Sequence, residues 1–554
     1  MLRIGFIIDG LLIGKQYRDL VDWIAHQPDM QLSAFIVQDL PREGGRITRF
    51  VESVRRTGWY RTLSRITFGM VIRVERKLLR GNARYLDAVS IDHIDAQHLT
   101  VRPIISKGGF VYRYESEDLA AITALDLDVL VRAGSGILRG KILHSARYGI
   151  LSFHHADNRI NRGGPPGFWE VLHKEPYTGF VIQKLTEELD GGEILFRGSL
   201  PTQYSFLRNQ ISVYESTTDH FATVLRRHLG GPVTPEPPHI YSQRLFMAPA
   251  FASTIKYIAQ QGVHFARRVQ RRLLNVREHW QVAILVGNWR EATLARGVVV
   301  PCPPGAFLAD PFVIDVADSK YLFVEEYPYA THKGVISAYR IEGDGSVQRL
   351  GVALEAEFHL SYPYVFQAGN EIFMCPETAQ TNQIRLYRSI DFPLRWELDT
   401  VLMDKVSAVD TNIFERDGRW WMLSSLKKSA IGGSSALYGF HADTPRGPWK
   451  PIRSNPLFVD ASKGRNGGLL RDGEDIFRVA QSANFGEYGS RSSIYRIDHI
   501  DADGYRETLM QHVEPGFFPN IRGTHSLNNS GDVLVYDFWK YERVNARLRR
   551  ESRQ

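Results

Sequence analysis

Cysteine is scarce in this chain, which has two, Cys302 and Cys375, among 554 residues. Two cysteines exclude a disulfide framework and suit a reducing compartment. Long apolar runs are lacking as well: no uncharged apolar stretch approaches the length of a transmembrane helix, so none is expected. The first residues pass directly into a strand-like segment (3–8), without the charged segment, apolar segment and cleavage site of a signal peptide. We therefore expect a cytoplasmic protein.

Acidic residues are in slight deficit, because 68 Lys and Arg face 61 Asp and Glu, a net charge of +7. Much of the excess lies in residues 46–81 and 266–280, where arginines alternate with apolar residues at helical spacing. Such stretches indicate a solvated helix face or a seam between domains; the alternatives are an anionic membrane surface or an acidic partner. No recognition motif for nucleic acid accompanies the charge, so no nucleic-acid partner is expected.

The chain is too long for a single core, and its organisation changes along its length. Over 1–205, strand-like and helix-like segments alternate, which predicts an α/β domain with a mainly parallel sheet. A basic stretch at about 43–85 interrupts this pattern and is expected to be an inserted helical pair. Residues 206–278 are expected to form a helical linker of two helices, separated by clustered Pro and Gly at 230–238.

Long helical patterns are absent from about residue 279 onward, and an internal repeat of about 50 residues takes their place. Each repeat begins with a short apolar strand and continues with a second strand, and in four repeats with a third. Four strands per repeat are typical of a propeller blade. The fifth repeat stops after its second strand, whereas 280–297 read as a third and a fourth strand without a first. The sequence predicts an all-β, five-bladed propeller over 279–554, closed by strands 280–297. The repeats begin at 310–314, 362–366, 410–414, 466–470 and 524–528.

Two histidines and a distant acidic turn stand out in the first domain. A predicted strand ends at His154, at the carboxyl edge where open α/β sheets bind ligands. Asp190 follows 36 residues later in a glycine-rich turn, and its carboxylate is able to orient an imidazole. The alternative is a structural His–Asp pair beside a turn. His155 is expected to be a loop residue rather than a second catalyst.

This stretch resembles the formyltransferase family that uses N10-formyltetrahydrofolate. The likeness spans about residues 1–202 and is sharpest over 128–196. The matching residues are His154, Arg162-Gly163, Thr178-Gly179, Leu189-Asp190 and Gly192-Glu193-Ile194.

The resemblance implies a Rossmann-like α/β fold, N10-formyltetrahydrofolate as cosubstrate, and transfer of its formyl group to an amine. His154 would act as general base or as a donor to the oxyanion, and Asp190 would hold its imidazole. The family has asparagine where Ser152 stands, so the serine hydroxyl would be the oxyanion donor, with Asn158 or Asn161 as alternatives. By the same resemblance, the folate would bind at Gly134, Gly136, Ile137, Leu138, Leu189 and Gly191, and the acceptor at Arg162, Trp169 and Asn158.

The β region resembles two families. Its Ala-Asp-Pro-Phe at 309–312 is similar to the first blade of the family 43-like glycoside hydrolases, which would make Asp310 a catalytic base. Tyr362 and Asp410 occupy the equivalent places in the next two blades, where those enzymes have Asp and Glu, and Glu377 is a candidate acid. Residues 357–378 resemble the propeller at the N-terminus of plant glucosamine inositolphosphorylceramide transferases, over about 300–540. Further candidates for the axial pocket are Arg465, Asn466 and His525.

Together these features predict a carbohydrate-modifying enzyme that formylates an amino sugar, nucleotide-linked or within a glycan, and binds or processes carbohydrate with its propeller. No metal is expected. A methionyl-tRNA acceptor fits less well, because a propeller stands where an RNA-binding β-barrel would be expected. Two alternatives remain: a carbohydrate-binding or scaffolding protein with a catalytically altered formyltransferase fold, which Ser152 favours, and a glycoside hydrolase centred on Asp310.

Overall fold

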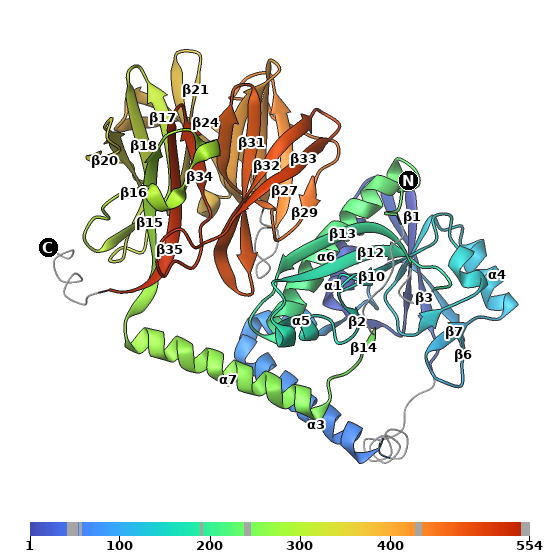
Figure 1. Ribbon diagram of the computed structural model, residues 1–554. Helices are drawn as coiled ribbons and strands as arrows, with labels where there is room; N and C mark the ends of the chain where they lie inside the picture. The colour runs from blue at the N-terminus through green and yellow to red at the C-terminus, as the bar shows by residue number, and fades with distance from the viewer. Residues whose placement is uncertain (41–53, 55–57, 189–191, 238–244, 427–434, 545–554) are drawn as a thin grey trace. The chain divides into compact units, whose positions relative to one another are not determined.

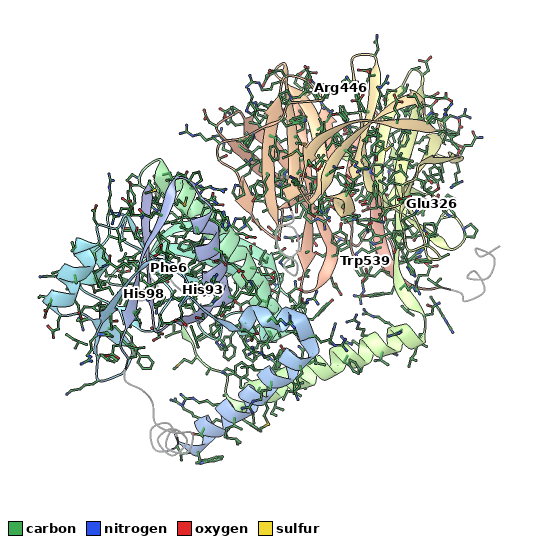
Figure 2. All side chains as sticks on the ribbon, turned by 180° about the vertical axis from the view of Figure 1, so that it is seen from behind. Phe6, His93, His98, Glu326, Arg446 and Trp539 are labelled. Atoms are coloured by element: carbon green, nitrogen blue, oxygen red, sulfur yellow. The ribbon has the colours of Figure 1, made fainter. Side chains whose placement is uncertain are left out.

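The structure is a computed structural model that describes residues 1–40, 54, 58–188, 192–237, 245–426 and 435–544. The chain divides into two compact units at residues 262 and 263, called here the α/β unit and the β unit. Phe6 lies within the first and Trp539 within the second (Figure 2). Among the described residues, the helices lack an apolar stretch long enough to cross a membrane.

A seven-stranded sheet forms the centre of the α/β unit, in the order β13-β12-β10-β8-β1-β3-β5 (Figure 1). Five neighbouring strands run parallel, whereas β12 and β13 are antiparallel additions at one edge. The chain leaves β1 toward β3 on one side and returns to β8 on the other, so the strand order reverses beside β1. Ligands bind at such a switch point in open α/β sheets, outside the carboxyl ends of the strands. The strands are β1 (Leu2–Ile8), β3 (Met30–Gln38), β5 (Gln97–Val101), β8 (Val129–Arg132), β10 (Ile150–His154), β12 (Tyr177–Lys184) and β13 (Glu193–Pro201).

Helices cover both faces of this sheet because its strands are apolar on both sides. On one face lie α1 (Lys15–Ala25) and α6 (Phe206–Leu229), and the ring of Phe221 stacks on Phe153 of β10 with centroids 4.4 Å apart. The opposite face packs against α4 (Ser116–Ala124) through a cluster that includes Ile122. Because α6 packs along the sheet, it belongs to the α/β unit and does not act as a linker.

The basic insertion contains one long helix in its described part, α3 (Trp59–Leu79), followed by a 3₁₀ helix, η1 (Arg80–Leu86). The remainder of the expected helical pair, 41–53 and 55–57, lies outside the described residues. Glu75 of α3 is buried, and its carboxylate accepts hydrogen bonds from the Leu207 amide at 2.7 Å and from the Tyr257 hydroxyl. The insertion is thereby fastened to the amino end of α6 and to α7 (Phe251–Leu273).

The β unit consists of five antiparallel sheets (Figure 1), and one end strand of each sheet is innermost: β17, β21, β25, β30 and β34. These innermost strands contact one another in a ring: β17 meets β21, β21 meets β25, β25 meets β30, β30 meets β34, and β34 meets β17. The arrangement is propeller-like. The sheets are β17 (Ala306–Val316), β18 (Ser319–Pro328), β19 (Val335–Ile341) and β20 (Val347–Leu354); β21 (Ser361–Ala368), β22 (Glu371–Glu377), β23 (Gln383–Asp391) and β24 (Arg395–Asp404); β25 (Ala408–Arg416), β26 (Arg419–Leu426), β27 (Ala436–Ala442), β28 (Lys450–Pro451) and β29 (Phe458–Val459); β30 (Arg465–Asp472), β31 (Asp475–Asn484), β32 (Glu487–Ile500) and β33 (Tyr505–Val513); and β16 (Val298–Val299), β15 (Val276–Val286), β35 (Val533–Arg543) and β34 (Leu527–Ser530).

The fifth sheet joins the two ends of the β unit. β15 pairs with β35 in an antiparallel register that runs unbroken from Val276 opposite Arg543 to Val286 opposite Val533. The strand expected at 288–297 is wrong, because these residues form two 3₁₀ turns and the outer strand is the short β16. The Asn288 side chain caps the first turn by accepting from the Arg290 amide, which favours a turn over an extended segment.

Candidate functional sites

The carboxyl edge of the α/β sheet carries an ordered cluster of polar side chains. Asp9 directly follows β1, and its carboxylate accepts from the Ser135 amide at 2.8 and 3.0 Å and from the Gln38 side chain at 2.7 Å. The Tyr114 hydroxyl donates to Gln38 at 2.7 Å, and Arg132, at the end of β8, donates to the Gly136 carbonyl. These bonds fix the loop after β8 at the switch point. Sequence reasoning missed Asp9 and Gln38, although polar residues that end buried apolar strands are a usable signal.

The two glycines expected to contact folate have steric reasons to be glycine. A Cβ at Gly134 would lie 2.6 Å from an oxygen of Asp9. Gly136 has a φ of 80° and approaches the Tyr112 ring, which a Cβ would meet at 2.5 Å. Ile137 and Leu138 form the short strand β9, and the Leu138 side chain lies in the apolar core. This segment therefore presents backbone, rather than the Leu138 side chain, to the edge of the sheet.

Alternation along β10 separates the two histidines. Ser152 and His154 point to one face of the sheet, whereas Phe153 and His155 point to the other. The half-buried His155 lies between the rings of Phe153 and Tyr214, with ring centroids 5.6 and 4.4 Å away. Burial lowers the pKa of His155 to about 3, so this imidazole is neutral. As expected, His155 lies in the loop after β10, where it packs between aromatic rings, and His154 is the histidine at the strand end.

The other residues expected in this site have mixed surroundings. Ser152 is buried, and its hydroxyl donates to the Phe153 carbonyl at 3.3 Å. Asn158 is buried as well, and its side-chain oxygen accepts from Arg197 at 3.1 Å. Leu189, Asp190 and Gly191 lie outside the described residues.

Trp169 is expected to contact the acceptor, but in the structure its indole nitrogen bonds to the protein itself. It lies on α5 (Phe168–His173), and its indole N–H donates to the carbonyls of Gly164 and Met247, both at 3.2 Å. Arg162 and Gly163 form β11, which pairs with β14 (Leu245–Phe246). This pairing and the bond from Trp169 to Met247 hold the same two segments together. Sequence reasoning could not foresee this arrangement, because the pairing partner lies more than 80 residues away.

In the β unit, three innermost strands share a bulge at the same place. The extra residues begin at Asp310, Tyr362 and Asp410, whose φ angles are 50°, 47° and 51°. Positive φ is rare for residues with a side chain and is most often retained where function requires the geometry. The bulges turn these three side chains into the centre of the β unit, where all three are buried.

Asp310 and His525 form the centre of one buried group. The Asp310 carboxylate accepts from the Tyr362 amide at 3.1 Å and from the Ser526 hydroxyl at 3.2 Å, and it lies 3.3 Å from Nε2 of His525. Nδ1 of His525 lies 2.6 Å from Asp537, which also accepts from the His525 and Ser526 amides. Burial alone would lower the pKa of His525, but Asp537 and Asp310 hold it above its usual range.

Asp410 forms the centre of a second group. Arg465 donates to both of its oxygens, at 2.6 and 3.1 Å, and Gln481 donates to one of them at 3.0 Å. The Asn466 side chain donates to the Asp410 carbonyl at 2.7 Å, and the Arg465 guanidinium lies 4.7 Å from the centre of the Tyr488 ring. A two-pronged guanidinium–carboxylate pair of this kind is a strong and geometrically specific contact. Asp410, Arg465 and Asn466, expected in one pocket, therefore do lie together.

Two glutamates complete the site. Burial, reinforced by Asp410, raises the pKa of Glu377 to about 8, although Arg465 opposes the shift. Glu325 on β18 is buried, and burial together with Asp310 and Glu377 raises its pKa well above the usual range. Sequence reasoning missed Glu325 and Asp537, because each lies within a strand and gains its partners only when distant sheets pack together.

Asp310 and Glu377 have the properties of an acid–base pair. Burial raises the pKa of Asp310 to about 6, with His525 opposing and Asp537 and Asp410 adding to the shift. At neutral pH, Asp310 is therefore mostly ionised while Glu377 is mostly protonated. Two carboxyl groups whose pKa values are driven apart can serve as general base and general acid.

One group of side chains in this part of the β unit has metal-ligand character. Ligand atoms of Asp310, His525 and Asp537 all lie within 4.8 Å of one another, and all three residues are buried. The sequence predicts no metal here. In the described geometry, the histidine already bridges the two carboxylates.

Comparisons with known proteins match the two units separately. Residues 292–527 match the family model described as glucosamine inositolphosphorylceramide transferase 1, N-terminal. The chain is 37% identical over 209 residues to glucosamine inositolphosphorylceramide transferase 1 of Oryza sativa subsp. japonica, covering 37% of this chain and 28% of that protein. It is 32% identical over 87 residues to methionyl-tRNA formyltransferase of Listeria monocytogenes, covering 16% of this chain and 28% of that protein.

The likeness of the β region to the N-terminal part of these plant transferases is therefore confirmed, over 292–527. The likeness to formyltransferases is weaker and partial. The chain spans 28% of the length of each of these two relatives. Among solved structures, a thermostable family-43 glycoside hydrolase aligns with 44% of this chain and 91% of its own, at 12% identity and a TM-score of 0.34, which is too low to carry an argument.

Proposed function

We propose that the chain is a carbohydrate-modifying enzyme whose α/β unit transfers a formyl group from N10-formyltetrahydrofolate to the amine of an amino sugar. The observation that carries this proposal is the place of His154 at the carboxyl end of β10. β10 pairs with β8, and hydrogen bonds to Asp9 and from Arg132 fix the loop that follows β8. The partial likeness to a formyltransferase supports it. The likeness of the β unit to the N-terminal part of plant transferases named for a glucosamine-bearing lipid supports a sugar acceptor rather than tRNA.

The residues of this chain have defined tasks in such a reaction. The amine nitrogen bonds to the formyl carbon while the bond from that carbon to N10 breaks, and the proton that the amine loses passes to N10. His154 accepts and returns this proton. The oxyanion that develops on the formyl oxygen needs a donor, and the Ser152 hydroxyl would have to turn from the Phe153 carbonyl to supply it.

The test is formyl transfer by the full chain. Isotopically labelled formyltetrahydrofolate is incubated with a panel of nucleotide-linked amino sugars, and labelled adducts are detected by mass spectrometry. Replacing a general base lowers rates by about 100- to 10,000-fold, so His154→Asn should abolish most of the label, whereas His26→Asn, an exposed histidine at the end of α1, should not. Absence of any adduct from chain that unfolds cooperatively would refute the proposal and favour a carbohydrate-binding or scaffolding role.

A second function is supported by the acid–base pair of the β unit. We propose that this unit is a five-bladed propeller whose axial pocket binds a glycan, with Asp310 as base and Glu377 as acid in a glycoside hydrolysis. Burial raises the pKa of both carboxyl groups, that of Glu377 to about 8 and that of Asp310 to about 6, and this difference supports the proposal. Asp310→Asn and Glu377→Gln should each remove glycan turnover, and the Glu377→Gln variant should retain binding. Turnover that survives both substitutions would leave a binding role alone.

A further inference from the structure

Two helices outside both sites present large apolar side chains on exposed faces. On α3, Trp59, Leu63, Ile66, Met70 and Val74 recur every three or four residues and are all exposed, Trp59 by 71%. Residues at this spacing lie in one stripe along a helix. The side of α3 that packs inward is different and includes Val71 and Glu75. The exposed stripe is therefore not the face that holds α3 in place.

The same arrangement recurs on α7. Ile255, Ile258, Phe265, Val269 and Leu273 follow the same spacing and are exposed, Phe265 by 69%. In its 23 residues, α7 buries only Thr254 and Tyr257 among those described. The helix thus buries little on the protein and turns its most apolar side to solvent. Exposed apolar surface of this extent marks an interaction site.

The charge of these two helices indicates the chemistry of the partner. Together they contain ten Lys and Arg and one acidic residue, Glu75, which is buried. The net positive charge of these two helices therefore exceeds the +7 of the whole chain, so the remainder of the chain is slightly acidic. On α7, Arg267 and Arg271 lie on the side of the helix away from the apolar stripe. An apolar face joined to a basic face is the pattern of helices that lie in the interface of a membrane.

We propose that α3 and α7 bind the surface of an anionic lipid bilayer, with their apolar stripes in the acyl boundary and their arginines at the lipid phosphates. The hydrogen bonds from the Phe251 amide to Ser64 and from Tyr257 to Glu75 hold α3 against the first turns of α7 (Figure 1), so α3 and the amino end of α7 are held together before they meet the lipid. A second copy of this chain is the less suitable occupant, because it would bring like charge to face like charge. The proposal does not depend on formyl transfer.

The experiment is cosedimentation of the full chain with vesicles. The chain should sediment with vesicles that contain phosphatidylglycerol and phosphatidylcholine, and should remain in solution with phosphatidylcholine alone. Salt should weaken the binding, because the attraction between exposed charges is screened. Failure to sediment with phosphatidylglycerol vesicles at low salt would overturn the proposal.

Matched variants separate the two contributions. Replacing both Arg267 and Arg268 by Gln should weaken binding about 30-fold, since each basic side chain near an anionic surface contributes about fivefold. Ile258→Ser should weaken it about tenfold through lost apolar burial. Leu398→Ser on β24 is the control, because the exposed fraction of Leu398, 48%, is nearly the same as the 47% of Ile258.

An equal loss with Leu398→Ser would overturn the proposal. So would a concentration-dependent dimer in analytical ultracentrifugation that Ile258→Ser dissociates, because a second copy would then be the occupant of this surface.

Discussion

Removing the charge of Asp310 should flatten the pH dependence of stability of the β unit. Burial raises the pKa of this carboxyl from 3.8 to about 6. One pKa unit corresponds to about 1.4 kcal/mol, so ionising Asp310 in the folded chain costs about 3 kcal/mol more than in the unfolded chain. The folded state therefore binds the extra proton, and this contribution is present below pH 4 and is lost as the pH rises through about 6. Asp310→Asn keeps the shape of the side chain but cannot ionise, so the variant does not lose this stability as the pH rises.

His525 acts in the same direction. Its pKa is raised, so its contribution to stability is present at low pH and is lost as the pH rises through the folded-state value. Part of that increase comes from Asp310, and the substitution removes it. The curve of unfolding free energy against pH should thus be flatter in Asp310→Asn, by about 3 kcal/mol or more between pH 4 and pH 8.

Urea unfolding of the full chain, followed by tryptophan fluorescence, measures this difference, because seven of the ten tryptophans lie in the β unit. Asp318→Asn is the control, since Asp318 is exposed on the turn after the same strand. Its curve should follow that of the parent chain. Parallel curves for Asp310→Asn and the parent chain would show that Asp310 is ionised in the folded protein without penalty, and the assignment of Asp310 as a base poised near neutral pH would then lose its basis.

Other substitutions test the packing that supports the two sites. Glu507→Gln removes the charge that two nitrogens of the buried Arg478 contact at 2.8 Å; breaking such a pair costs about 3–5 kcal/mol, and the midpoint of urea unfolding should fall accordingly. Trp169→Phe should lower unfolding free energy by about 1–2 kcal/mol through its lost hydrogen bonds and should leave the KM for acceptor unchanged, whereas a raised KM would return Trp169 to the binding site. Gly467→Ala places a Cβ 2.0 Å from the His525 carbonyl, and calorimetry should show the β unit melting several degrees lower; an unchanged melting temperature would contradict this close approach.

Local pattern was sufficient for much of the secondary structure. The short apolar strands of the β region are predictable because each repeat places its turn residues at the same spacing. In the α/β unit, β10 ends at His154, as its apolar run predicts. The segment 288–297 shows the limit of such patterns. It is apolar enough for a strand, yet Asn288 caps a turn and the Tyr536 hydroxyl bonds the Leu294 carbonyl from a strand more than 200 residues away.

The buried polar groups around Asp310 depend on long-range contacts of the same kind. Asp310 and Glu377 were identifiable from their places at strand starts and ends, and the structure provides the burial that drives their pKa values apart. Asp537 was not identifiable, because it lies 227 residues from Asp310, whose backbone amide donates a hydrogen bond to the Asp537 carboxylate. Its role becomes visible only when the last strand of the chain pairs beside the first sheet.

The pairing of β15 with β35 also sets the order of events during synthesis. β15 ends at Val286 and β35 ends at Arg543, so at 5 to 20 residues per second the ribosome needs roughly 13 to 50 seconds to deliver the partner strand. During this interval the α/β unit is already complete, while the edge of β15 that will pair with β35 has no partner and is able to pair with other chains. A fragment that stops at residue 527, where the family match ends, would keep that edge open permanently. Aggregation during expression should therefore depend on how quickly the last 30 residues arrive.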